Sequence, residues 1–92
     1  MYSDPRLAFK LGEFIQSFED KLIYSKPKVG DLVRELQRLN EMLEEEDREI
    51  PNSWIDYLKQ NYGSLDELDP DDRKALVQDL EGIKQSITNK IK

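Results

Sequence analysis

The chain contains no histidine and no cysteine among its 92 residues. Without histidine, general acid–base catalysis would depend on carboxylates, lysines or tyrosines with strongly shifted pKa values. Without cysteine, disulfides, thiol nucleophiles and zinc sites with Cys ligands are all excluded. The four glycines form neither a G-x-G-x-x-G nor a Walker-type loop, so no phosphate-binding motif is present. We therefore expect a protein that is not an enzyme and needs no cofactor.

Long apolar segments are also lacking. No run approaches the ~18 consecutive apolar residues that a membrane-spanning helix requires. The sequence opens with Met1-Tyr2-Ser3-Asp4 and shows no apolar stretch behind a basic one, so no signal peptide is predicted. A chain of 92 residues is long enough for one domain with a modest core. We expect a single domain over 1–92 and a cytoplasmic location.

Negative charge, in contrast, is abundant and unevenly distributed. The chain has 20 Asp and Glu against 14 Lys and Arg, for a net charge of −6. Residues 41–72 hold most of the carboxylates and only two cations, Arg48 and Lys59. The cluster at 66–72 contains Pro70 and lacks the glycine of an EF-hand calcium loop, so no metal site is predicted. An acidic middle indicates either a basic partner or a purely solubilising role.

Apolar residues recur every three or four positions over most of the chain, which is typical of amphipathic α-helices. These repeats predict four helices, at about 5–23, 27–47, 53–62 and 70–90. Asp4-Pro5 and Asp69-Pro70 mark two of the starts, because Asp caps open backbone N–H groups and Pro suits the first helical position. Pro51 is predicted to end the second helix, because the residue before a proline disfavours helical geometry.

No segment alternates with period two, so the predicted fold class is all-α: a small antiparallel helical bundle of three long helices plus one short helix. The first and last helices have clear apolar stripes, made of Leu7, Leu11, Phe14, Phe18 and Leu22, and of Leu76, Leu80, Ile83, Ile87 and Ile91. The strict seam of the second helix would also suit a coiled coil. A homo-oligomer that shares this seam is therefore left open.

An acidic run lies at the predicted C-terminal end of the second helix, where the helix dipole favours cations. A run that breaks a local rule without a structural gain indicates a functional surface. We predict that its four residues bind a basic protein partner: Glu44, Glu45, Glu46 and Asp47. The alternative is a solvated, frayed helix end.

Three aromatic residues complete the predicted partner-binding site. Phe9 lies about 160° from the centre of the first apolar stripe, at 100° per residue. Tyr57 lies off the face of Leu58, next to Trp54. Exposed aromatic residues beside acidic ones are common at binding hot spots. Phe9 could instead pack under the N-terminal segment, and Tyr57 could cover a loop. Gly82 lies off its helix stripe, which either a partner or random tolerance explains.

The leading hypothesis is a small non-enzymatic interaction module that docks its acidic patch and nearby aromatic residues on a basic protein. The alternative is an inhibitor that imitates nucleic acid and blocks a DNA- or RNA-binding protein, of the viral or mobile-element counter-defence type. Direct nucleic-acid binding is disfavoured, because the available cations are interleaved with acids and the chain is acidic. Those cations are Lys21, Lys26, Lys28, Arg34 and Arg38.

Overall fold

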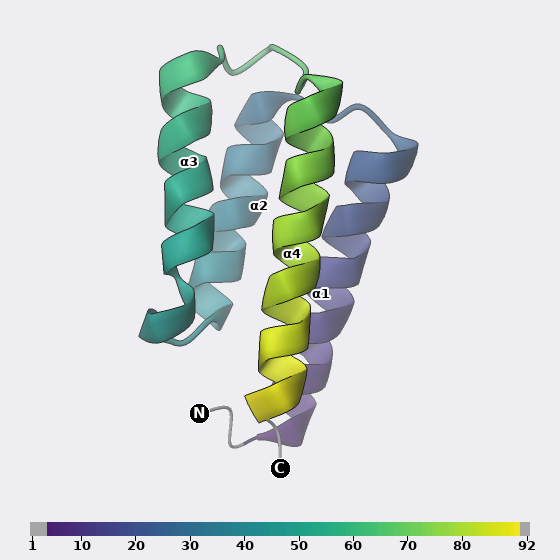
Figure 1. The fold of residues 1–92 in the computed structure, drawn as a ribbon, viewed down its shortest axis with the longest axis vertical. Helices are drawn as coiled ribbons and strands as arrows, with labels where there is room; N and C mark the ends of the chain where they lie inside the picture. The colour runs from purple at the N-terminus through teal and green to yellow at the C-terminus, as the bar shows by residue number, and fades with distance from the viewer. Residues whose placement is uncertain (1–3, 91–92) are drawn as a thin grey trace.

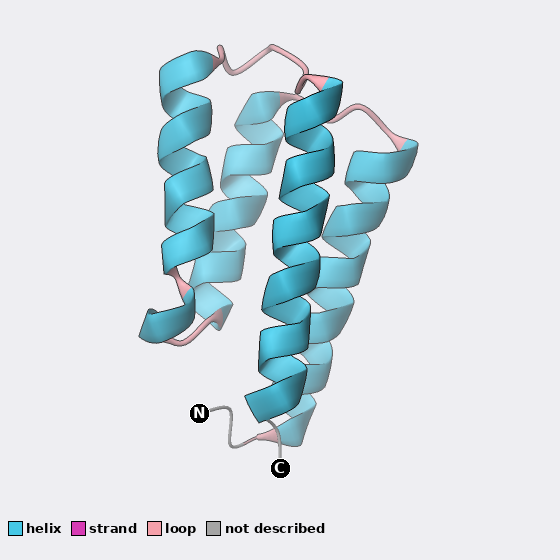
Figure 2. Cartoon of the chain, in the orientation of Figure 1, coloured by secondary structure: helices cyan, strands magenta, loops and turns pink. Residues whose placement is uncertain are grey.

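Four α-helices run alternately up and down in the computed structural model, which describes residues 4–90 (Figure 1). They are α1 (Pro5–Tyr24), α2 (Val29–Met42), α3 (Glu49–Asn61) and α4 (Pro70–Lys90), with a one-turn 3-10 helix η1 (Glu45–Asp47) between α2 and α3. Over residues 4–90 there is no strand, only an isolated bridge between Lys28 and Glu67 (Figure 2). The predicted all-α antiparallel bundle is confirmed.

The two Asp-Pro pairs begin α1 and α4 as predicted. The Asp4 carboxylate accepts a hydrogen bond from the Arg6 backbone N–H at 2.9 Å. At the start of α4, the Asp69 carbonyl accepts from the Arg73 N–H at 2.8 Å. Both helices match their predicted ranges within one residue. Ile91, the last member of the predicted stripe, lies outside the described residues.

The second helix is shorter than predicted, because it ends at Met42 and not at residue 47. The N–H of Leu43 still bonds within the last turn, but its backbone then becomes extended. Arg48 donates from Nε to the Leu43 carbonyl at 2.9 Å and so satisfies an acceptor that a longer helix would have used. Because α2 ends at Met42, residues 44–47 do not lie at its C-terminal end, where the helix dipole disfavours negative charge.

The third helix begins earlier than predicted, at Glu49 instead of residue 53. Pro51 is its third residue and is buried, so the prediction that this proline ends the preceding helix was wrong. Proline is tolerated there because first-turn N–H groups have no partner within the helix. The carboxylates of η1 consequently precede the N-terminus of α3, where the helix dipole favours them. The bundle thus has two long and two shorter helices.

The loop between α3 and α4 crosses the start of α2 and explains why this helix begins at Val29. The Val29 N–H donates to the Asp66 carbonyl at 2.8 Å, and the Gly30 N–H donates to the Ser64 carbonyl at 2.9 Å. A Cβ atom at Gly30 would lie 3.1 Å from that Ser64 oxygen. The absence of a side chain at Gly30 therefore lets the loop approach closely enough to cap α2.

The hydrophobic core runs along the axis of the bundle, and α1 packs chiefly on α4 while α2 packs on α3. Its largest fully buried side chains include Leu11, Ile15, Phe18, Leu22, Leu32, Leu36, Leu39, Leu58, Leu76, Leu80 and Ile87. Leu7 was predicted to belong to this core but is 43% exposed. It lies in the first turn of α1.

One carboxylate is buried at the contact between α1 and α4. Glu19 is 3% exposed, and its Oε2 lies 3.3 Å from Lys84 Nζ. The same ammonium contacts Glu81 at 3.0 Å and the Gln16 side-chain oxygen at 2.8 Å. Burial raises the pKa of Glu19, whereas the hydrogen bond to Glu81 raises the pKa of Lys84. Lys84 therefore pairs with a buried carboxylate and links the two long helices, α1 and α4.

Candidate functional site

The helix α3 has two apolar faces, one buried in the core and one at the edge of the core, where Trp54 packs against it. Ile55 and Leu58 point into the bundle and are buried. Ile50, Trp54 and Tyr57 step by four and three residues and so share a second face. On that face Ile50 is 40% exposed, Tyr57 is 41% exposed and Trp54 is half-buried. We call these three residues the α3 ridge.

Aromatic residues of α3 and of the turn that follows it are held by carboxylates of α4. Trp54 donates from Nε1 to Asp79 Oδ2 at 2.7 Å. Asp72 Oδ2 accepts from the Tyr57 hydroxyl at 3.0 Å and from the Tyr62 hydroxyl at 2.5 Å. These bonds fix the orientation of the rings and connect α3 to α4. Sequence analysis missed both carboxylates as partners of aromatic residues, because no local pattern pairs residues that lie up to 25 positions apart.

Tyr57 also contacts both neighbouring aromatic rings edge-on. Its ring centroid lies 5.6 Å from that of Trp54 and 6.4 Å from that of Tyr62. Burial, followed by the hydrogen bond to Asp72, raises the pKa of Tyr62 to about 12. The hydrogen bond to Asp72 is the main cause that raises the pKa of Tyr57. Both phenols donate to the same carboxylate oxygen, which therefore holds their protons more tightly than water would.

The raised pKa of Tyr62 predicts that stability falls at alkaline pH. The unfolded state loses this proton near pH 10, whereas the folded state retains it to about pH 12. Because the folded state then binds more protons, the free energy of unfolding decreases as the pH rises through this window. Urea unfolding at pH 9 and pH 11 tests this, and Tyr62→Phe should show the smaller decrease. Equal decreases for the two proteins would contradict it.

Two surface cavities lie along the boundary between α3 and α4. The larger, of about 340 Å³, is lined by Ser53, Trp54, Tyr57 and Asp72. The smaller, of about 130 Å³, is lined by Glu46, Asp47, Glu49, Ile50, Gly82, Ile83 and Ser86. We call the surface formed by these residues the α3–α4 groove. The two cavities share no lining residue among those described, and together they combine apolar side chains with carboxylates from both helices and from η1.

Part of the predicted acidic run lies at one end of the groove and is paired within the chain. Lys90 Nζ lies 2.8 Å from Asp47 Oδ1 and 3.1 Å from Glu46 Oε1, and the hydrogen bond to Asp47 is the main cause that raises the pKa of Lys90. Glu46 and Glu45 are exposed, whereas Asp47 and Glu44 are half-buried. The premise that this run ends a helix against its dipole was wrong, because it belongs to η1 and its approach. Binding of a partner by these four residues stays a prediction.

Three of these carboxylates lie close together. Oxygens of Glu44, Glu46 and Asp47 lie within 4.8 Å of one another, which is close enough for a metal ion. The Lys90 ammonium, however, already contacts both Glu46 and Asp47. This cluster is therefore explained as an ion-pair site that ties the end of α4 to η1.

Phe9 is exposed as predicted but lies apart from the other predicted site residues. Its side chain is 69% exposed on α1. Among the described residues that line the two cavities, none belongs to α1. The structure therefore brings Trp54 and Tyr57 together with Glu46 and Asp47 along one groove, and leaves Phe9 outside it.

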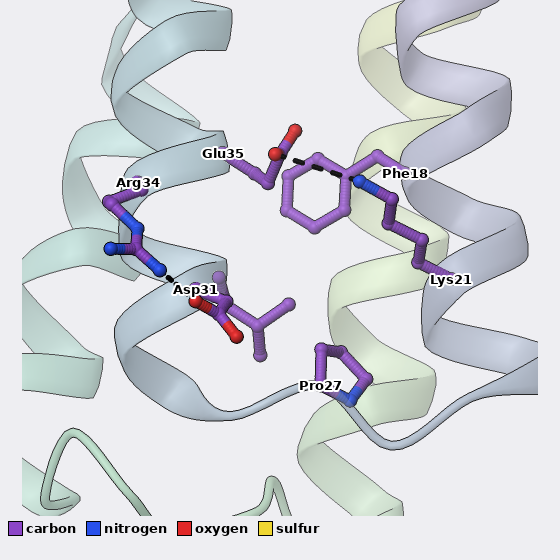
Figure 3. A pocket seen from close by; sticks show the side chains of 7 residues that line it. Phe18, Lys21, Pro27, Asp31, Arg34 and Glu35 are labelled. Atoms are coloured by element: carbon purple, nitrogen blue, oxygen red, sulfur yellow. Dashed lines mark hydrogen bonds and ion pairs between the residues drawn. The ribbon is translucent and has the colours of Figure 1, made fainter.

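A further pocket of about 270 Å³ lies between α1 and α2, and both basic and acidic side chains line it (Figure 3). Lys21 of α1 reaches toward Glu35 of α2 beside the Phe18 ring, with 3.6 Å between Nζ and Oε1. Arg38 also contacts Glu35, at 3.9 Å, and Arg34 pairs with a neighbouring aspartate, Asp31. Three of the five cations considered above for nucleic-acid binding, Lys21, Arg34 and Arg38, are therefore paired with carboxylates of the same chain.

Comparison of the chain with protein-family models, curated proteins and solved structures found no match. None of the helices within residues 4–90 is both long enough and apolar enough to cross a membrane. The function must therefore be inferred from the groove and its residues.

Proposed function

We propose that this chain is a small non-enzymatic interaction module that binds a basic protein partner through the α3–α4 groove. One observation carries the proposal: Ile50 and Tyr57 of the α3 ridge are exposed, and Trp54 is half-buried, between carboxylates of η1, α3 and α4. Apolar and aromatic side chains in such a position supply contact area, and the surrounding charges select and steer the partner.

The charge of the groove supports a basic partner. Of the described residues that line the two cavities, four are acidic and none is Lys or Arg: Glu46, Asp47, Glu49 and Asp72. Lys90 neutralises part of this charge at one end. Because the whole chain carries a net charge of −6, its long-range field also attracts cations. Electrostatic steering of this kind weakens as salt is added.

Glu46 and Glu49 are the best acids with which to test the role of charge. Both are exposed, so replacing their carboxylates by amides leaves the core intact. Asp47 and Glu44 are less suitable because they are half-buried, whereas Glu46 is exposed although it contacts Lys90 at 3.1 Å. Glu13 and Asp20 are exposed acids on α1 and serve as a matched control.

Affinity capture from nuclease-treated lysate, at low salt and at about 0.5 M salt, tests the proposal. The expected result is a basic protein that wild type retains at low salt, that Glu13→Gln/Asp20→Asn retains equally, and that Glu46→Gln/Glu49→Gln loses. A partner without excess positive charge, or equal loss from both variants, would contradict the proposal. Displacement of the captured protein by duplex DNA would favour the nucleic-acid-mimicking alternative.

A further inference from the structure

The shape of the α3–α4 groove limits what kind of segment can occupy it. Its α3 side presents the side chains of Ile50, Trp54 and Tyr57 along one helical face. Its α4 side has small residues at Gly82 and Ser86, and no atom lies within 4 Å of the position of a Cβ at Gly82. Small residues opposite an apolar ridge leave room for the side chains of a third element.

The ridge is also held in place before any partner arrives. The hydrogen bonds from Trp54 to Asp79 and from Tyr57 to Asp72 fix both rings against α4. The edge-on contact between the two rings, at 5.6 Å, restricts them further. A surface that is already ordered loses less conformational entropy on binding.

The length of the ridge and its charge define the segment that fits. The helix α3 has 13 residues and is therefore about 20 Å long at 1.5 Å per residue. A helix of about the same length would present apolar residues to the ridge at i, i+3, i+4 and i+7. Glu46 and Glu49 at one end and Asp72 at the other would face its flanks, where Lys or Arg would complement them.

We infer that the α3–α4 groove binds a basic amphipathic helix of a partner protein, with its apolar stripe on the α3 ridge and its cations on the acidic rim. The inference rests on the proposed function and specifies the form of the partner segment. It also assigns a role to Gly82, since a side chain there would enter the space that the helix occupies.

Synthetic peptides of about 15 residues test this inference directly. The first has Leu at helical spacing with Arg on both flanks, the second has the same composition in scrambled order, and the third has Glu in place of Arg. None contains Trp, so the fluorescence of Trp54, the single tryptophan of the chain and a member of the ridge, reports binding. We expect the first peptide to bind at least tenfold more tightly than either control, with a gain in helical circular dichroism.

Variants of the protein locate the binding surface. Gly82→Leu should weaken binding of the first peptide at least tenfold, whereas Gly12→Leu, the same change on α1, should leave it unaltered. At both positions a Cβ atom would have no neighbour within 4 Å beyond its own helix backbone, and circular dichroism checks that each variant folds. Glu46→Gln/Glu49→Gln, which adds no bulk, should also weaken binding and keeps the test valid if Gly82→Leu is unstable.

The outcomes separate this inference from the proposed function. Equal binding of the ordered and scrambled basic peptides would overturn the helix but leave a basic partner in place. Tightest binding of the Glu-containing peptide, or no response to any peptide, would overturn the inference of a basic helical segment. The capture experiment would then decide by itself whether the partner is basic. Unaltered binding by both groove variants would place the site elsewhere. Self-association in sedimentation that Gly82→Leu abolishes would show that a second copy is the occupant.

Discussion

Replacing Lys84 by Met is expected to lower the free energy of unfolding by about 2–3 kcal/mol at pH 7. The variant keeps most of the aliphatic stem but removes the ammonium that lies 3.3 Å from the buried Glu19 carboxylate. Removing one partner of a buried ion pair leaves a charge that neither water nor protein compensates. The side chain of Lys84 is 24% exposed, so we place the loss at or just below the lower limit of the usual range of about 3–5 kcal/mol. Urea unfolding followed by circular dichroism measures it.

The pH dependence of this loss identifies its cause. Burial already raises the pKa of Glu19, and without Lys84 its pKa rises further, so the folded variant binds a proton more readily than the unfolded chain does. Its stability should therefore increase as the pH falls toward about 4.5, and the defect should be smaller at pH 5 than at pH 7.

Two further variants serve as controls for Lys84→Met. The double variant Glu19→Gln/Lys84→Met should regain much of the lost stability, because it removes the buried charge itself. Lys74→Met makes the same change at an exposed position of α4 and should alter stability by less than about 0.5 kcal/mol. A Lys84→Met defect that does not depend on pH, or that matches Lys74→Met, would show that this pair does not stabilise the bundle.

The second large effect is expected from Leu58→Ala, which should cost about 3 kcal/mol. Leu58 is fully buried, and α3 places few side chains in the core besides it, chiefly Ile55 and Pro51. Because α3 packs mainly on α2, a cavity at Leu58 weakens the principal attachment of the whole helix. The same substitution would also make the α3 ridge, which borders the proposed binding groove, less rigid.

Trp54 makes this effect measurable, because the single tryptophan lies on α3. In Leu58→Ala, the change in Trp54 fluorescence should precede the loss of helical circular dichroism as urea increases, whereas the two transitions should coincide in wild type. Leu65→Ala makes the same substitution at a side chain that is 78% exposed and should be nearly neutral. A loss below about 1 kcal/mol in Leu58→Ala would show that α3 is held by contacts outside the core.

Much of the fold could be predicted because its signals are local. The Asp-Pro pairs at residues 4–5 and 69–70 act within one turn, and they begin α1 and α4 where they were expected. The apolar periodicity required only that each helix bury one face, which any bundle provides. The exposure of Phe9 followed from the same geometry, since 100° per residue places it opposite the buried stripe.

The segment from residue 43 to residue 51 shows where local reasoning fails. Its periodicity continued the second helix through the acidic run, and Pro51 looked like a stop signal. In the folded chain, Arg48 bonds to the Leu43 carbonyl, Lys90 pairs with Asp47, and Pro51 lies in the first turn of α3. Lys90 is separated from its partner by 43 residues, so the contact depends on where α4 packs.

The sequence alone determined that this protein is an acidic bundle of helices without histidine or thiol chemistry, because composition and spacing act residue by residue. Only the tertiary structure decided which acids and aromatic residues meet. Trp54 reaches Asp79, and Tyr57 reaches Asp72, because α4 runs antiparallel beside α3 (Figure 1). The free energy of such a contact depends on the distance between the two side chains, and this distance is set only when the helices pack together.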